Sequence, residues 1–272
     1  MSTQLLRPSG IEYVRWAVNW RRGCAHGCRY CYAAAMAHRF GSGPDRWINS
    51  KPVVPDPAAA LRSQLARKRK PVDGMILVSS SHDPFVPGIG REGAGVIEVL
   101  GEFGLWPQTL LLTKSPCAAL QALGDMGASP DGLWFGTSLT GWSFSLAARY
   151  EPRAERPGER LDALRAAARR GYRVWVSLEP PLPGVRLTAL AGLVSSLEPK
   201  PWLVLGKMNA RSSRDPTLRA WTRSPHWADD RDAAVAILQA AGFRESPTPR
   251  RGGFLVKREL NISIGGKHEY QV

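Results

Sequence analysis

Residues 19–32 read NWRRGCAHGCRYCY, and the three cysteines of this stretch follow the spacing C-x3-C-x2-C. Thiolates are soft ligands that suit iron–sulfur clusters, and a 4Fe–4S cube offers four irons. Cys24, Cys28 and Cys31 therefore leave one iron without a protein ligand, open to a substrate or cofactor. Gly23 and Gly27 allow the backbone to wrap tightly around such a cube.

Zinc and a buried trio of inert thiols are the alternatives for this stretch. Structural zinc takes four protein ligands, and His26 is the available fourth, although its place between two of the cysteines is poor for closing a tetrahedron. The remaining cysteine, Cys117, stands alone. Four cysteines in a cytosolic chain do not suggest a disulfide scaffold, and clustered thiols in a reducing compartment indicate metal or redox chemistry.

Outward from the cysteines, short apolar runs alternate with helical patterns, which is typical of a parallel α/β fold. Strands are expected over 13–20, 75–79, 109–113, 133–139, 173–178 and 202–205. Helices are expected over 32–40, 57–70, 95–103, 117–123, 160–170 and 233–241. Because each parallel neighbour needs a helical crossover, a partial (β/α)6 barrel of the TIM-like type is the economical architecture.

The expected domain division follows from this count. Residues 1–209 form the barrel core, and residues 210–272 form a short extension, with a helix and a candidate hairpin over 254–264. Barrels place their chemistry on loops at the carboxyl ends of strands. The cysteine loop and the segments 80–87, 114–117, 140–142 and 179–184 are therefore expected to converge on one face.

Composition sets the class of protein and its candidate partners. With 272 residues, 43% hydrophobic and 22% charged, the chain is long enough for one sizeable core. No apolar segment reaches the length of a membrane span and no secretory leader is recognisable, so we expect a cytoplasmic protein without membrane contact. Lys and Arg number 37 against 23 Asp and Glu, a net charge of +14. This excess favours contact with nucleic acid phosphates, although an arginine-rich solvated surface explains it equally well.

The motifs also carry a family resemblance. The pattern C-x3-C-x-aromatic-C resembles the signature of the radical S-adenosylmethionine superfamily. The longer run resembles the spore photoproduct lyase-like group, also called DNA repair photolyases, whose loop reads approximately Asn-Pro-Tyr-x-Gly-Cys-x-His-Gly-Cys-x-Tyr-Cys-Tyr. Trp20 and Arg21 depart from its Pro-Tyr pair. The segments SSHDPFVP (80–87), LTKS (112–115), EPR (151–153), ERL (159–161) and EPPLPG (179–184) are similar to further elements of the group, in the same order, so that the resemblance covers about residues 19–209.

The resemblance implies a barrel of the radical S-adenosylmethionine type and a mechanism. Cys24, Cys28 and Cys31 would ligate three irons of a 4Fe–4S cluster, and S-adenosylmethionine would chelate the fourth. An electron from the cluster would cleave the sulfonium, and the resulting 5′-deoxyadenosyl radical would abstract a hydrogen atom from the substrate. Cys117 is a candidate hydrogen-atom donor, as a cysteine is in spore photoproduct lyase; its alternative role is that of a small buried hydrophobic residue.

Further cofactor contacts are implied by position. Tyr30 matches the aromatic residue that contacts adenine, and its alternative role is packing at the barrel rim. Ser80, Ser81 and Asp83 lie where the superfamily binds the methionine amino group, although the usual Gly-Gly-Glu is absent. The remaining predicted contacts are Ser138 and Thr140 for the ribose, and Gly206 and Lys207 for the adenine.

Family and charge together predict a nucleic acid substrate, DNA first and RNA second, and a monomer that receives electrons from a flavodoxin or ferredoxin. Trp47, Trp142, Trp221 and Trp227 lie in loop-like segments, where they would stack on exposed bases or cover the open side of the barrel. Two alternatives stay open. One is a radical enzyme that acts on a peptide or small metabolite, and the other is a non-enzymatic metal-cluster regulator that binds nucleic acid.

Overall fold

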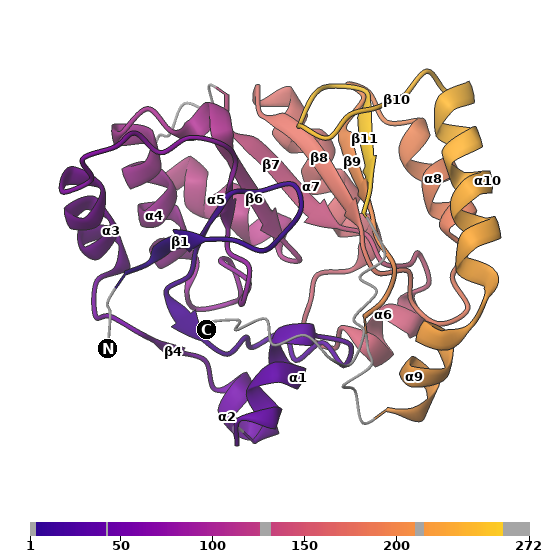
Figure 1. Cartoon of the computed structure of the whole chain (residues 1–272), viewed down its shortest axis with the longest axis horizontal. Helices are drawn as coiled ribbons and strands as arrows, with labels where there is room; N and C mark the ends of the chain where they lie inside the picture. Colours follow the sequence, from indigo (N-terminus) through magenta and orange to yellow (C-terminus); the bar gives the residue numbers. More distant parts are fainter. Residues whose placement is uncertain (1–3, 42, 126–131, 210–214, 258–272) are drawn as a thin grey trace.

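The computed structural model describes residues 4–41, 43–125, 132–209 and 215–257 (Figure 1). Its main sheet has the strand order β1-β2-β5-β6-β7-β8-β9-β11-β10. The strands are β1 (Leu6–Pro8), β2 (Trp16–Val18), β5 (Ile76–Val78), β6 (Thr109–Thr113), β7 (Trp134–Ser138), β8 (Arg173–Leu178), β9 (Trp202–Leu205), β11 (Gly253–Val256) and β10 (Arg244–Glu245). Among the described strands of this sheet, only β1 pairs antiparallel, with β2. A separate antiparallel ribbon pairs β3 (Arg21–Arg22) with β4 (Lys51–Pro52).

The expected α/β fold with a mostly parallel sheet is confirmed. The six predicted strands correspond to β2, β5, β6, β7, β8 and β9, and they lie side by side in chain order with parallel pairing throughout. Apolar runs such as Leu110, Leu111 and Ile76 to Val78 are buried, as strands covered on both faces require. The closure of this sheet into a partial barrel stays a prediction.

Helices connect the parallel strands and form two groups. The crossover helices are α3 (Pro57–Ala66), α4 (Gly90–Glu102), α5 (Pro116–Asp125), α7 (Pro157–Arg169), α8 (Leu187–Ser195) and α10 (His226–Ala240). Four others, α1 (Tyr32–Arg39), α2 (Pro44–Ile48), α6 (Phe144–Tyr150) and α9 (Pro216–Arg223), gather at the lower side of the view in Figure 1. Proline begins α3, α7 and α9 at a position where its missing N–H costs no helical hydrogen bond.

Aromatic residues fill the sheet face that the crossover helices do not cover. Trp175 lies 5.6 Å from Trp202 and 6.1 Å from Tyr13, measured between ring centroids. Its indole N–H donates to the carbonyl of Leu111 at 2.9 Å. Gly136 pairs with Trp175 across the sheet, and a Cβ at Gly136 would lie 2.2 Å from the indole nitrogen. Because side chains alternate along a strand, the smaller Ser138 shares this face nearer the carboxyl end of β7.

Several boundaries differ from the sequence expectation. Helix α4 begins five residues before the expected 95, and α10 begins seven residues before the expected 233. The segment after 209 adds α9, α10, β10 and β11, with α10 packed on α8. Strand β11 pairs parallel with both β9 and β10, and residues 258–264 of the expected hairpin lie outside the described residues. The domain division at residue 209 stays a prediction.

The length and hydropathy of the helices test whether one of them could span a membrane. In the four described ranges, no helix combines the length and the hydropathy that a bilayer span needs.

The contact between Gly136 and Trp175 gives a stability prediction. Gly136→Ala is expected to lower the free energy of unfolding by about 1–3 kcal/mol, because the added methyl group overlaps the buried indole. Gly158→Ala in α7 is the matched control, since no heavy atom lies within 4 Å of a Cβ there. Urea unfolding of both variants checks this, and equal stabilities would contradict the packing described.

Candidate functional site

Asn19 joins the cysteine loop to the turn that follows β5. Its side-chain oxygen accepts hydrogen bonds from the Ser79 hydroxyl at 2.6 Å and from the Ser81 backbone N–H at 3.1 Å. Its amide nitrogen donates to the Ser80 hydroxyl at 2.9 Å. The first and second parallel strands therefore end in one shared network, in which Ser80 and Ser81 have fixed positions.

Asp83 and His26 form the second connection at this edge. The Asp83 carboxylate lies 3.1 Å from Nε2 of His26 and accepts from the Lys114 backbone N–H at 2.6 Å. It also accepts from the Thr113 hydroxyl at 2.7 Å. Burial alone would raise the pKa of Asp83, but His26 and the backbone donors outweigh it and hold the pKa below its usual range. Asp83 thus fixes the cysteine loop to the end of β6.

Glu151 is the third connection and is completely buried. Its carboxylate is 2.5 Å from the guanidinium of Arg160, and it accepts from the Thr140 hydroxyl at 3.0 Å and from the Tyr30 hydroxyl. Burial would raise the pKa of this carboxyl, but Arg160 and Lys114 lower it below its usual value. Glu151 is therefore held as a carboxylate, and Arg160 balances its charge.

Lys114, directly after β6, is a cation whose charge lowers the thiol pKa of Cys28 and of Cys31. Its ammonium donates to the Ser138 hydroxyl at 3.3 Å, lies 4.0 Å from Glu151 and stands 5.7 Å from the centre of the Tyr30 ring. Burial raises the pKa of the Cys28 thiol well above its usual value, and Lys114 opposes that rise. The lysine thus supplies positive charge where a thiolate needs it.

Burial governs the protonation of the three thiols of the loop. Burial raises the thiol pKa values of Cys24, to about 12, and of Cys31, so metal binding must displace protons. The loop is closely supported, because Cys24 donates its N–H to the Trp47 carbonyl at 2.9 Å and a Cβ at Gly23 would lie 2.1 Å from that oxygen.

His26 is not a suitable metal ligand. Its Nδ1 lies 2.9 Å from the Arg153 carbonyl oxygen and its Nε2 faces Asp83, so both nitrogens are occupied. Among the described residues, no three His, Cys, Asp or Glu side chains stand close enough to hold one ion. Cysteines that each bind a different iron of a cube need not meet at one point, whereas zinc ligands must. In the described ranges, His26 therefore does not supply the fourth ligand that the zinc alternative needs.

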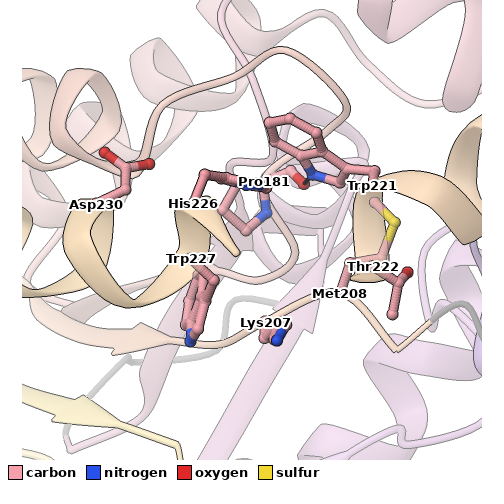
Figure 2. Close-up of a pocket in the computed structure, with 8 residues that line it drawn as sticks. All are labelled: Pro181, Lys207, Met208, Trp221, Thr222, His226, Trp227 and Asp230. Atoms are coloured by element: carbon pink, nitrogen blue, oxygen red, sulfur yellow. Dashed lines mark hydrogen bonds between the residues drawn. The ribbon is translucent and has the colours of Figure 1, made fainter. Parts of the chain in front are cut away.

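The loops after β8 and β9 also reach the cysteine loop, at the same edge of the sheet. Leu182 and Met208 pack with Tyr30 and Tyr150, and Cys28 contacts the same cluster. Lys207 and Met208 line a small pocket with Pro181, Trp221 and Trp227, where the Trp221 and His226 rings face each other at 3.8 Å (Figure 2). The expectation that the five loop segments meet at one edge is thereby confirmed, and Gly206 and Lys207 adjoin it.

Cys117 lies away from these contacts. It is exposed at the beginning of α5, its N–H donates to Glu155 at 2.8 Å and its sulfur lies 3.7 Å from the Glu159 carbonyl oxygen. Burial and the side chain of Glu155 raise its thiol pKa to about 12, so the thiol keeps its proton. Its predicted role as hydrogen-atom donor stays a prediction.

Four residues that sequence reasoning did not assign organise the site: Asn19, Lys114, Glu151 and Arg160. Each stood in a motif that was quoted for the family resemblance. Their partners lie 9 to 121 positions away in the chain, so no local pattern predicts these contacts.

The family comparison accounts for most of the chain. Residues 8–228 match the family described as "protein of unknown function (DUF5131)". The chain belongs to this family. Two uncharacterized proteins are similar to this DUF5131 chain: ORF301 of Acidianus two-tailed virus, 27% identical over 198 residues, and MJ0683 of Methanocaldococcus jannaschii, 24% identical over 179 residues. The matches cover 66% and 65% of the chain, and in both cases 64% of the relative, so the chain spans less than two thirds of these curated relatives.

Solved structures of spore photoproduct lyase share the fold of the DUF5131 chain. A complex with dinucleoside spore photoproduct has a TM-score of 0.61 at 14% identity, covering 94% of this chain and 80% of that one. A variant with bound AdoMet and dinucleoside spore photoproduct has a TM-score of 0.61 at 13% identity, covering 92% and 78%. The expected likeness of the fold to the spore photoproduct lyase type is thus confirmed.

The buried pair of Glu151 and Arg160 gives a second stability prediction. Glu151→Ala is expected to lower the free energy of unfolding by about 3–5 kcal/mol, because it leaves the Arg160 guanidinium buried without a carboxylate. Arg165→Ala removes the exposed ion pair with Asp162 on the same helix and is expected to cost at most about 1 kcal/mol. Urea unfolding at neutral pH compares the two variants, and similar small losses would contradict this role of Glu151.

Proposed function

We propose that the chain is a radical S-adenosylmethionine enzyme that repairs or modifies nucleic acid. The observation that carries the proposal is the position of the three-thiol loop. It leaves the first parallel strand at the carboxyl edge of the sheet and is bonded there, through His26 and Tyr30, to Asp83 after β5 and to Glu151 after α6. This arrangement occurs within a fold shared with a lyase whose structure has been solved with AdoMet bound.

Cys24, Cys28 and Cys31 are the proposed ligands of a 4Fe–4S cluster. When bound, the cluster supplies the electron that cleaves S-adenosylmethionine and so provides the radical for hydrogen abstraction. The protein contributes three protonated thiols, which release their protons on assembly, and the ammonium of Lys114, whose charge favours the thiolate form of Cys28.

The hydrogen bonds already present refine the cofactor contacts. Thr140 donates its hydroxyl proton to Glu151, whereas Ser138 accepts from Lys114 and keeps its proton for a ribose oxygen. Ser138 is therefore the better proposed ribose donor. The proposed contacts of the methionine group are Ser80 and Ser81, which Asn19 holds, and Asp83. The Asp83 carboxylate is already bonded to the Thr113 hydroxyl and the Lys114 backbone N–H.

The remaining contacts concern the adenine and the shape of the site. The proposed adenine contacts are Tyr30, Gly206 and Lys207. Tyr30 packs in one cluster with Leu182 and Met208, and Gly206 and Lys207 directly precede Met208 in the chain. The proposal includes the partial barrel as the form of this site and residues 210–272 as an extension that packs on the core.

The proposed substrate is DNA, with RNA second, because the chain carries a net charge of +14 and shares its fold with a lyase solved with a dinucleoside spore photoproduct. A base that meets a radical inside a sheet-lined site must first leave its stack. We further propose a cytoplasmic monomer that takes electrons from a flavodoxin or ferredoxin, with Cys117 as a hydrogen-atom donor.

Anaerobic reconstitution tests the cluster and the reaction together. The wild-type chain is expected to bind about four irons and four sulfides and, with dithionite and S-adenosylmethionine, to release 5′-deoxyadenosine. Cys28→Ala is expected to lower this release at least ~100-fold, because it removes a ligand. Cys117→Ala, the matched cysteine control, is expected to keep the iron and sulfide content of the wild type.

Two results would contradict the proposal. One is release of 5′-deoxyadenosine by Cys28→Ala at the wild-type rate. The other is one zinc per chain, in place of iron and sulfide, after oxygen-free purification.

A further inference from the structure

Two large aromatic side chains stand in solvent where the chain leaves β7 for α6. Trp142 is 52% exposed and Phe144 is 60% exposed. Apolar surface of this size needs a reason, since most large aromatic side chains of a folded protein are buried. Of the four tryptophans predicted to stack on bases, Trp47 and Trp227 are buried, which leaves Trp142 as the exposed one.

Trp221 is the fourth of these tryptophans, and its ring has partners within the protein. Its N–H donates to the Pro181 carbonyl at 3.1 Å and its ring faces His226. The structure therefore selects Trp142 from this set.

Three exposed arginines share the segment with these aromatic rings: Arg149, Arg153 and Arg156. None of them has an ion-pair partner in the part of the chain that the structure describes. The guanidinium of Arg156 stands 4.7 Å from the centre of the Phe144 ring, so a positive charge and an exposed aromatic face lie together.

In the described part of the chain, the neighbouring carboxylates form no ion pair with these arginines and are bonded elsewhere. Glu151 is directed inward to Arg160, and Glu155 accepts the backbone N–H groups of Cys117 and Ala118. Glu159 accepts the backbone N–H of Arg156 at 2.7 Å, at the beginning of α7. The surface of residues 142–156 is therefore basic and aromatic at once.

This surface is fixed beside the cysteine loop. The Tyr150 carbonyl accepts the Arg29 N–H at 3.0 Å, and the Arg153 carbonyl oxygen lies 2.9 Å from the His26 ring. The Arg153 guanidinium in turn donates to the Ala25 carbonyl at 3.1 Å. A strand bound on residues 142–156 would thus lie next to the loop that carries the three thiols.

We propose that residues 142–156 form a platform for single-stranded nucleic acid. Trp142 and Phe144 stack on unpaired bases, and Arg149 and Arg156 contact the phosphates between them. Exposed rings can stack on a base only when that base has left its duplex, which selects single strands over duplex. The inference rests on the proposed function for the reaction that the bound strand would undergo, and it names the surface that presents the strand.

Fluorescence anisotropy with labelled 12-nucleotide oligo(dT) and oligo(U) tests the platform on the full chain. Trp142→Ala is expected to weaken binding roughly 5- to 150-fold, the effect of losing one stacked base. The double variant Arg149→Gln/Arg156→Gln is expected to reduce the slope of log K against log salt concentration by about 1.4, since each phosphate contact contributes about 0.7. The DNA and RNA probes show which sugar the platform prefers.

Two controls keep the test specific. Phe103→Ala removes another aromatic side chain, 38% exposed at the end of α4, and Arg250→Gln removes an exposed arginine in the turn before β11. Both are expected to bind the probes as the wild type does, and thermal unfolding verifies that every variant is folded. Three results would overturn the platform. Trp142→Ala could bind the probes as tightly as the wild type, or the control variants could lose as much affinity as Trp142→Ala. The third result is that the wild type and Trp142→Ala both bind blunt duplex more tightly than the single-stranded probes.

Two results distinguish failure of the platform proposal from failure of the proposed function. Release of 5′-deoxyadenosine by the wild-type chain without any oligonucleotide, combined with no binding of either probe at low salt, overturns the platform alone. Tight binding that depends on Trp142, combined with no cleavage of S-adenosylmethionine, overturns the proposed reaction alone.

Discussion

The buried charge of Glu151 is the constraint on which the candidate site depends. A carboxylate removed from water is stable only when charged and hydrogen-bonding partners surround it. Arg160 supplies the opposite charge at 2.5 Å, and Thr140 and Tyr30 supply hydroxyl donors. These partners come from α7, from the end of β7 and from the cysteine loop. To satisfy one charge, three distant segments must therefore meet, and the cysteine loop is held over the sheet.

Asn19 and Asp83 apply the same principle on the other side of the loop. Each has a side chain whose acceptors are satisfied by groups from a neighbouring loop, so the ends of β2, β5 and β6 stay together. The same sheet has an apolar and aromatic face, on which Trp175 packs against Gly136. Polar side chains at the ends of β2, β5 and β6 are thus held in place on a sheet with a packed apolar face. Such an arrangement suits the positioning of a cofactor.

Apolar runs made the parallel strands predictable, because strands buried on both faces show continuous hydrophobic residues. Helices were less accessible. Helix α8 is apolar on nearly all sides, so it lacks the alternation that indicates a surface helix. The first turn of helix α4 contains Gly90 and Gly93, and glycine has a low helix propensity, so the sequence predicts a later beginning. Gly93 is needed there because a Cβ would lie 2.4 Å from the Pro84 carbonyl oxygen. The spacing of the three cysteines was enough to predict them as metal ligands. The roles of Glu151 and Arg160 could not be predicted, because only the fold shows that they form a buried ion pair.

The central claim is that three cysteines hold a cluster with one open iron. Electron paramagnetic resonance of the reduced, oxygen-free protein, recorded with and without S-adenosylmethionine, tests it most directly. The account predicts a 4Fe–4S signal that changes when the cofactor is added and that is absent from Cys24→Ala. A signal that the cofactor leaves unchanged, or one that persists in Cys24→Ala, would contradict the account.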